Sequence, residues 1–214
     1  MNRLITSRLA AMVVASTAAL LPSAAQALPF AVMFDAGLRT MSNSNDTEKA
    51  IFGAKRGIGA GLGVSFDKGD RWRFSIEGRR IKRDGERAFA ADRTSPAFRL
   101  GHPLAFTMTP VLASAAFRFS RLLGVSPYLS VGGGMMSWKE QSDIAGLIEK
   151  SSGTSGLFEA KFGIERDQGP VRLGLEGGIT FVPGAVGVGG ISQVYEEKDL
   201  GGVFVVGRIG FSRK

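Results

Sequence analysis

The sequence lacks cysteine and contains a single histidine, His102. The absence of cysteine excludes thiolate zinc sites, iron–sulfur clusters and a disulfide scaffold. Because the carboxylates are scattered and the one histidine has no spaced partner, the sequence predicts no metal site. No cofactor is expected either, since the glycine-rich run at 57–64 departs from the G-x-G-x-x-G spacing of a dinucleotide loop and no helix is predicted after it.

Long hydrophobic runs are also missing after residue 27, where no apolar segment reaches the about 20 residues that a membrane-spanning helix needs. Insertion of this part into a membrane would therefore have to use strands. The beginning of the chain differs: a basic start precedes an apolar segment at 9–21, and Ala25-Gln26-Ala27 fits the small-x-small rule for cleavage. The sequence thus predicts a cleaved signal peptide at 1–27, rather than a retained anchor, and one domain at 28–214.

Positive charge is in excess but is not concentrated in one segment of the chain. The formal net charge is +8, and the basic residues are scattered along the chain rather than gathered in one block. No finger, helix-turn-helix or RNP-like motif accompanies them, so nucleic acid is not an expected partner. Phosphate groups on lipid fit this distribution better than phosphate groups on DNA.

After residue 27, apolar and polar residues alternate with a period of two, which is typical of strands with two unlike faces. Most of these segments are longer than soluble strands and match the about 9–11 residues that cross a bilayer at a tilt. The predicted strands are Phe30–Met41, Ala54–Asp67, Arg71–Lys82, Leu104–Ser120, Ser126–Trp138, Gly156–Arg166, Pro170–Pro183 and Gly201–Phe211. This pattern predicts an all-β fold, namely an eight-stranded antiparallel up-and-down transmembrane β-barrel.

The connections between the predicted strands alternate between short and long. The short ones, at 68–70, 121–125 and 167–169, contain the Gly and Asp residues that favour tight hairpin turns. The long ones are polar or glycine-rich and cover Ser42–Gly53, Arg83–Pro103, Lys139–Ser155 and Gly184–Leu200. Short periplasmic turns that alternate with longer extracellular loops are the wiring of outer-membrane barrels.

Five of the predicted strands, namely the first, third, sixth, seventh and eighth, sort their charges onto one face and their large apolar side chains onto the other. In a membrane barrel the apolar face meets lipid and the charged face lines the interior. Both signs occur in near balance, so each buried ion can have a partner that offsets its desolvation. The predicted interior charge network comprises Asp35, Arg39, Arg73, Glu77, Arg79, Glu159, Lys161, Glu165, Arg172, Glu176 and Arg208.

Three further patterns concern particular positions. Aromatic residues gather near the short-turn end of the strands, where a belt at the lipid–water boundary is expected. They are Phe30, Phe66, Trp72, Phe117, Phe119, Tyr128 and Phe211. Gly57, Gly59, Gly61 and Gly63 alternate on the predicted inward face of the second strand, where small residues leave room for long charged side chains. Pro110 is expected to cause a bulge in the fourth strand.

The fifth predicted strand begins with Ser126-Pro127-Tyr128 and continues into the glycines at 132–134, and the chain closes with an alternating segment at 201–211. These features resemble the small outer-membrane barrels typified by the OmpA transmembrane domain and OmpX, over 28–214. The resemblance implies an eight-stranded barrel with periplasmic termini, inserted by the barrel-assembly machinery, that serves envelope integrity, adhesion or weak pore formation. The chain departs from this family by continuing past its last aromatic residue, Phe211.

We therefore expect a non-enzymatic protein of the cell outer membrane, without catalytic residues, that supports the envelope or recognises a host or surface ligand through its loops. One alternative is a lipid A-modifying acyltransferase or deacylase, in which His102 would activate a nucleophile. Neither a His-x-Ser nor a G-x-S-x-G pattern accompanies His102. Another is a soluble lipocalin-like carrier, but neither Trp72 nor Trp138 supplies the G-x-W start of its first strand.

A basic segment near the second long loop is the last candidate. Arg80, Lys82, Arg83 and Arg87 are expected at the outer rim, beside the phosphates of lipopolysaccharide. Arginine forms forked, charge-assisted bonds to phosphate, and a solvated basic loop is an equally good interpretation of the same residues. Outer-membrane lipid and lipopolysaccharide are thus the expected lipid partners.

Overall fold

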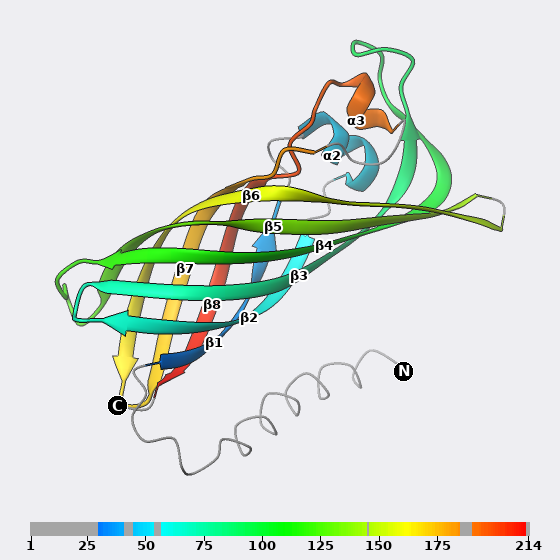
Figure 1. Cartoon of the computed structure of the whole chain (residues 1–214). Helices are drawn as coiled ribbons and strands as arrows, with labels where there is room; N and C mark the ends of the chain where they lie inside the picture. The colour runs from blue at the N-terminus through cyan, green and yellow to red at the C-terminus, as the bar shows by residue number, and fades with distance from the viewer. Residues whose placement is uncertain (1–29, 41–44, 54–56, 145, 185–189, 213–214) are drawn as a thin grey trace, which may run out of the picture.

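The computed structural model describes residues 30–40, 45–53, 57–144, 146–184 and 190–212, and the predicted signal peptide lies outside them. In this part of the chain, eight antiparallel strands form one closed barrel in sequence order, with β1 paired to β8 (Figure 1). The strands are β1 (Phe30–Arg39), β2 (Gly57–Lys68), β3 (Trp72–Phe89), β4 (Phe98–Arg118), β5 (Ser126–Ile144), β6 (Leu147–Gln168), β7 (Val171–Phe181) and β8 (Gly202–Ser212). The predicted eight-stranded up-and-down barrel is confirmed.

Three tight turns join the strands at one end of the barrel, as predicted. They connect β2 to β3, β4 to β5 and β6 to β7. Gly69, Gly124 and Gly169 lie in these turns with φ angles of 64°, 83° and 62°. Side chains with a Cβ rarely adopt this left-handed conformation, so the glycines allow the chain to reverse within a few residues.

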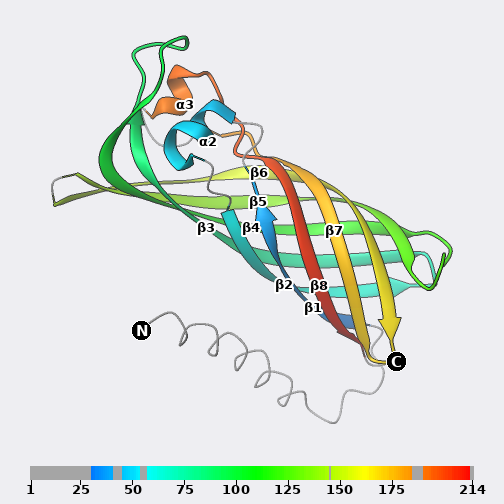
Figure 2. The same ribbon diagram turned by 180° about the vertical axis from the view of Figure 1, so that it is seen from behind.

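The second and third predicted long loops are instead β-hairpins. β3 and β4 stay paired out to Phe89 and Phe98, and β5 and β6 stay paired out to Ile144 and Leu147. Strands β3 to β6 therefore have 18 to 22 residues, whereas β1, β2, β7 and β8 have 10 to 12 (Figures 1 and 2). The loop prediction was wrong because the regular alternation of apolar and polar residues breaks down in the outer segments of these strands, as in the polar run from Lys82 to Arg87, whereas backbone pairing continues there.

The first and fourth predicted long loops contain short helices, α2 (Asn45–Phe52) and α3 (Ile191–Val194), which the sequence interpretation missed. The backbone N–H groups of Asp46 and Thr47 donate to the carboxylate of Glu197, at 3.0 and 2.8 Å. A helix start leaves such donors without intrahelical partners, so this carboxylate caps α2. The capping residue lies 150 positions from Thr47, where no local pattern could identify it.

Pro110 does not produce the predicted bulge. Its pairing with Met136 of β5 belongs to an uninterrupted register. On the other side, pairing with β3 is interrupted at Pro110, which has no N–H to donate, and resumes in the same register. The register shift between β3 and β4 lies instead between Glu86 and Ala88, in the outer part of the hairpin.

The barrel wall is apolar outside and charged inside. Large apolar side chains are exposed on the outer face of every strand, and we call this outer surface the belt. It includes Leu38, Leu62, Val64, Ile76, Val111, Val131, Met135, Phe158, Phe162, Leu175, Phe181, Val203 and Val205. This orientation is the one predicted for a membrane barrel and the reverse of that of a soluble barrel. Among the described residues, no helix is both long enough and apolar enough to cross a membrane.

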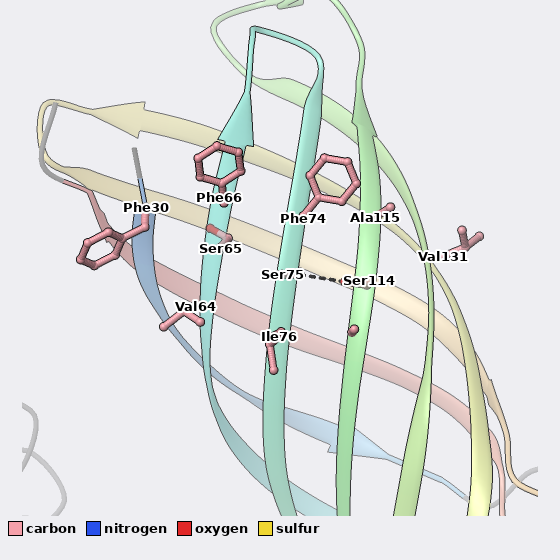
Figure 3. Close-up of a pocket in the computed structure, with 11 residues that line it drawn as sticks. Phe30, Val64, Ser65, Phe66, Phe74, Ser75, Ile76, Ser114, Ala115 and Val131 are labelled. Carbon is pink, nitrogen blue, oxygen red and sulfur yellow. Dashed lines mark hydrogen bonds between the residues drawn. The ribbon is translucent and has the colours of Figure 1, made fainter. Parts of the chain in front are cut away.

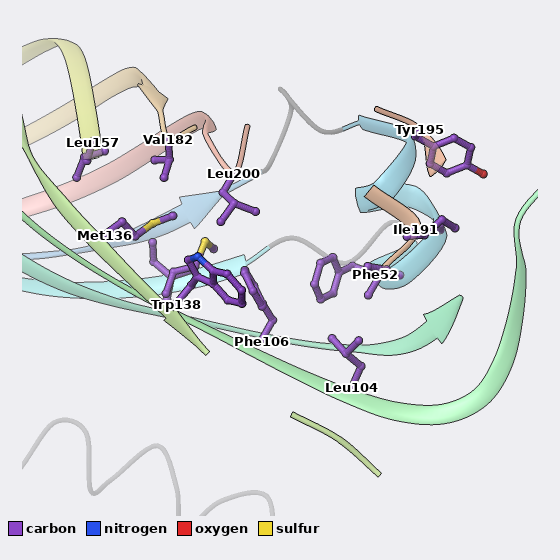
Figure 4. Close-up of a cluster of buried hydrophobic side chains, with 14 of the residues drawn as sticks. Phe52, Leu104, Phe106, Met136, Trp138, Leu157, Val182, Ile191, Tyr195 and Leu200 are labelled. Atoms are coloured by element: carbon purple, nitrogen blue, oxygen red, sulfur yellow. The ribbon is translucent and has the colours of Figure 1, made fainter. Parts of the chain in front are cut away.

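A hydrophobic cluster fills the barrel interior at the end where α2 lies (Figure 4). Its largest contribution comes from the inward face of β4, with Leu104, Phe106, Met108 and Leu112. Phe52 of α2 packs against Phe106, with 6.3 Å between the ring centroids. The interior is therefore charged toward the short turns and hydrophobic toward the opposite end, a division that the sequence interpretation did not include.

Candidate functional site

The charges inside the barrel form two clusters. The first, which we call the central cluster, contains four carboxylates and four cations among the described residues: Asp35, Glu77, Glu159, Glu176, Arg39, Arg79, Lys161 and Arg208. Arg79 lies at its centre. Its guanidinium donates to Glu159 at 2.8 and 3.0 Å and to Glu77 at 2.5 Å, and it lies 3.4 Å from Asp35. Equal numbers of each sign offset the desolvation that burial imposes on every member.

The second cluster, which we call the turn-end cluster, lies near the short turns. It joins three carboxylates and three guanidinium groups of the described chain: Asp67, Glu165, Asp167, Arg73, Arg118 and Arg172. Arg73 connects two strands, since it donates to Asp67 at 2.7 Å and to Glu165 at 2.5 and 2.9 Å.

The two clusters together contain all eleven residues of the predicted interior network. Asp67, Arg118 and Asp167 were missed, although a signal was present for two of them. Asp67 continues the alternation of Gly57 to Gly63, and Asp167 lies two positions after Glu165. In a strand, residues two apart share a face, so the same rule, applied to these two positions, would have placed both inside.

The glycines of β2 provide the space for the central cluster. A Cβ at Gly61 would meet the side chains of Arg79 and Asp35 at 2.6 and 2.8 Å, and one at Gly63 would meet Glu77 at 2.9 Å. Contacts this short are essentially never seen for real Cβ atoms. The prediction that inward-facing glycines accommodate long charged side chains is therefore confirmed at these positions.

Tyr128 points into the barrel, so the prediction that it belongs to the lipid-facing aromatic rim was wrong. Its side chain is buried and its hydroxyl donates to Glu176 at 2.8 Å. The neighbouring Leu129 takes the outward position instead. A phenol ring offers both apolar area and a hydrogen-bond donor, and here the donor is used by the central cluster.

The other aromatic residues of the predicted rim keep at least part of their surface outside. Phe30, Phe66, Trp72 and Phe119 are exposed, and Phe117 is half-buried between Trp72 and Phe119, with edge-on contacts at 5.3 and 5.4 Å. They lie close to the short turns, as predicted for an aromatic belt.

Gly163 lies directly opposite Tyr128 in the β5–β6 pair, and a Cβ at this position would overlap the tyrosine ring. We expect Gly163→Val to displace the ring, to break the hydrogen bond to Glu176 and to lower the free energy of unfolding by about 1–3 kcal/mol. Urea unfolding of the barrel in phospholipid vesicles, followed by tryptophan fluorescence, measures this change. Gly156→Val in the same strand is the control, because an added Cβ there meets no described atom within 4 Å; an equal loss in both variants would contradict the prediction.

Helix α2 covers the hydrophobic end of the interior. Arg83 of β3 donates to Glu48 of α2 at 2.8 Å, and its guanidinium lies 4.2 Å from the centroid of the Phe52 ring. Both Arg83 and Glu48 are buried. The predicted contact of Arg83 with lipopolysaccharide does not fit this position, because its side chain points inward and joins the helix to the barrel wall.

The other three members of the predicted lipopolysaccharide contact differ from one another. Arg80 and Lys82 are exposed and point outward from β3. Arg87 is half-buried and forms an ion pair with Glu149 of the β5–β6 hairpin. The structure thus brings Arg80 and Lys82 to one surface and separates Arg83 and Arg87 from them.

The outer part of the β3–β4 hairpin contains two further titratable groups, His102 and Asp92. His102 lies in β4, half-buried. At the tip, the Asp92 carboxylate accepts hydrogen bonds from the hydroxyl and N–H of Thr94 and from the N–H of Ser95, all at 2.8 Å. The hydrogen bonds from Thr94 and Ser95 lower the pKa of Asp92 to about 2. Among the described residues, no group of three or more histidines and carboxylates could hold a metal ion.

An open apolar groove of about 680 Å³ lies on the outer wall across β1 to β5 (Figure 3). Ala113 and Ala115 leave room there between the larger side chains of Phe74, Ile76 and Val131. The hydroxyls of Ser75 and Ser114 hydrogen-bond to each other at 2.7 Å behind it. Its apolar lining makes this groove part of the belt.

No family model and no curated relative matches the chain. Among solved structures, a major outer membrane protein from Thermus thermophilus matches with a TM-score of 0.55 and 8% identity, over 85% of this chain and 98% of that one. Ail, the attachment invasion locus protein of Yersinia pestis, in complex with the heparin analogue sucrose octasulfate, has a TM-score of 0.48 and 16% identity, over 85% and 96%. The N-terminal β-barrel domain of Pseudomonas aeruginosa OprF has a TM-score of 0.42 and 11% identity, over 87% and 98%. With the closed eight-stranded meander, the first of these similarities shows that the chain has the fold of the small outer-membrane β-barrels, similar to the OmpA transmembrane domain and OmpX.

Proposed function

We propose that this protein is a non-enzymatic outer-membrane barrel that presents the β3–β4 and β5–β6 hairpins at the cell surface for adhesion or surface recognition. The observation that carries the proposal is the difference in strand length: β1, β2, β7 and β8 end with the belt, whereas β3 to β6 continue beyond it. On β5, the belt ends at Met135 and the strand continues to Ile144, which is roughly 30 Å farther at about 3.3 Å per residue.

The direction of each side chain supports membrane insertion. The belt would expose a continuous apolar surface to water in a soluble protein, and surfaces of this kind usually mark contact with lipid or another protein. The 10 to 12 residues of the shorter strands suit a bilayer crossing at a tilt. The interior is filled by the two charge clusters and the hydrophobic cluster, so we expect a closed barrel rather than an open pore.

The hairpin tips carry exposed apolar side chains. Phe89 and Phe98 contact each other with tilted rings at 5.4 Å between centroids and are 49% and 55% exposed. At the other tip, Leu147 and Ile148 are 74% and 57% exposed. Exposed apolar side chains on projecting hairpins are suited to contact another surface, which favours recognition over purely mechanical support.

Surface display can be tested by single-cysteine labelling, because the sequence has no cysteine of its own. On intact cells, a membrane-impermeant maleimide should label Ile148→Cys at the β5–β6 tip and should not label Asp70→Cys in the β2–β3 turn. Lysed cells should show labelling of both variants. Labelling of Asp70→Cys alone on intact cells would reverse the proposed orientation, and recovery of the protein in the osmotic-shock fraction would exclude membrane insertion.

The recognition role predicts that the tips determine adhesion. Replacing Phe89, Phe98, Leu147 and Ile148 with Ser should reduce the retention of expressing cells on a host-cell or abiotic surface to the level of cells without the protein. The barrel should remain folded, as judged by heat-modifiable migration in a gel. If the wild-type protein adds no retention on any surface, recognition is the wrong role and envelope support replaces it.

A further inference from the structure

Two rows of outward-facing residues lie directly beyond the belt on β3, β4 and β5. We call this surface the basic band; it consists of Arg80, Lys82, Thr107, Thr109, Ser137 and Lys139. The row nearer the belt contains Arg80, Thr109 and Ser137, and the outer row contains Lys82, Thr107 and Lys139. In the outer row, Lys82 pairs with Thr107, and Thr107 pairs with Lys139. The threonine hydroxyl therefore lies between two lysines on a single line across three strands.

The cations of the basic band are not neutralised by any residue that the structure describes. Arg80, Lys82 and Lys139 are exposed, and none of them forms an ion pair with a described residue. The two rows carry no carboxylate, and the nearest outward carboxylate on β3 is Asp84, one row farther out. This differs from Arg83 and Arg87 of the same strand, which are paired.

Among the described residues, the basic band lies on one side of the barrel. At the same end of the wall, β1, β7 and β8 present the exposed apolar side chains Leu38, Phe181 and Val203. A general attraction to an anionic surface would be served by cations all around the barrel. Cations limited to β3 and β5, with the threonines of β4 between them, indicate a discrete ligand instead.

The spacing of the basic band suits a phosphate group. Neighbouring strands lie about 4.8 Å apart, so the backbones of Lys82 and Lys139 are separated by roughly 10 Å, and their long side chains can converge on one anion above Thr107. Arginine supplies a forked donor, lysine a point charge, and threonine a hydroxyl donor, and all three are common partners of phosphate oxygens. The adjacent belt places this anion at the depth where lipid headgroups begin.

We propose that the basic band binds the phosphorylated sugar headgroup of lipopolysaccharide in the outer leaflet. This rests on the proposed function, which places the hairpin ends of β3 to β6 outside the cell. Of the four residues that the sequence predicts to contact lipopolysaccharide, this site includes Arg80 and Lys82. It contains Lys139 and Thr107 in place of Arg83 and Arg87. The ligand is a component of the membrane itself, distinct from any surface recognised by the hairpin tips.

The test measures binding of fluorescent deep-rough lipopolysaccharide to the full mature chain folded in detergent micelles. The triple variant Arg80→Gln/Lys82→Gln/Lys139→Gln should bind about 100-fold more weakly, since it loses several charge-assisted bonds. Thr107→Val, which removes only the hydroxyl, should bind about fivefold more weakly. The matched control Lys49→Gln/Lys150→Gln/Lys198→Gln removes the same charge from exposed positions at the same end of the protein and should bind like the wild type.

Two further probes identify the ligand. Dephosphorylated lipopolysaccharide should lose the difference between the wild type and the triple variant, and vesicles of phosphatidylglycerol should not compete. Equal binding by the wild type and the triple variant, an equal loss in the control, or full competition by phosphatidylglycerol would overturn the proposal. Cysteine labelling on intact cells separates this failure from that of the proposed function, because it reports orientation independently of lipid binding.

Discussion

Replacing Arg79 with Met is expected to lower the free energy of unfolding of the barrel by about 3–5 kcal/mol. Arg79 is 3% exposed and is shared among Glu77, Glu159 and Asp35. Without it, the central cluster would hold four carboxylates against three cations, and one buried carboxylate would lose its partner. Urea unfolding in phospholipid vesicles, read by tryptophan fluorescence, measures the change.

The matched control is the double variant Arg79→Met/Glu159→Met. It restores equal charge numbers, and replacing a buried ion pair with apolar side chains of similar size is often close to neutral. We therefore expect the double variant to be more stable than Arg79→Met alone. If the two losses simply add, charge balance is not what stabilises the interior.

The second large effect is expected for Phe52→Ala, which should detach helix α2 and leave the barrel intact. Phe52 is 1% exposed and lies between Phe106 and Arg83. Removing a buried Phe side chain costs about 3–5 kcal/mol, and a helix of 8 residues has little stability of its own. Trypsin cleavage after Lys49 should therefore become about 100-fold faster, because it follows the population of the open form.

Leu147→Ala is the control for this effect, because Leu147 is an exposed apolar residue at the tip of the β5–β6 hairpin and does not belong to the hydrophobic cluster that holds α2. It should leave cleavage after Lys49 unchanged. Mass spectrometry of the fragments identifies the cleaved bond, and heat-modifiable migration reports the barrel. Unchanged cleavage in Phe52→Ala would show that α2 is held by other contacts, such as the bonds from Asp46 and Thr47 to Glu197.

The sequence predicted most of the barrel because lipid imposes a strict rule on one face of each strand. Where Ile76 and Phe74 alternate with Glu77 and Arg73, the period of two fixes both the strand and its orientation. The tight turns were predictable for a similar reason, since Gly69 and Gly169 favour a conformation that few other residues adopt.

The same rule explains what could not be predicted. Beyond the belt, lipid no longer selects apolar side chains, so the strand segment ending at Phe89 looked like a loop. The inward aromatic Tyr128 was misplaced because a phenol is common at a lipid boundary and equally able to donate inside a charge cluster. Arg83 was misassigned because its partner, Glu48, belongs to a helix that only the folded chain brings near.

The basic band could not be predicted from any single strand, because it depends on how three strands are aligned with one another. Lys82 and Lys139 are separated by more than fifty positions and become neighbours of Thr107 only through the registers of β3, β4 and β5. Each residue alone has the appearance of an ordinary solvated side chain. The alignment of three strands is therefore what distinguishes the proposed binding surface from scattered charge.

Each of the strands β3 to β6 continues as a single strand from the short turns toward the hairpin tips, and β4 and β5 remain hydrogen-bonded as far as Leu104 and Ser142. The projection is therefore not a separate module on a hinge. A force applied at a tip acts along the strand axes and loads many backbone hydrogen bonds of the wall in shear at once. A cell attached through these tips would be held by the whole barrel, and the tether would yield only when the wall itself does.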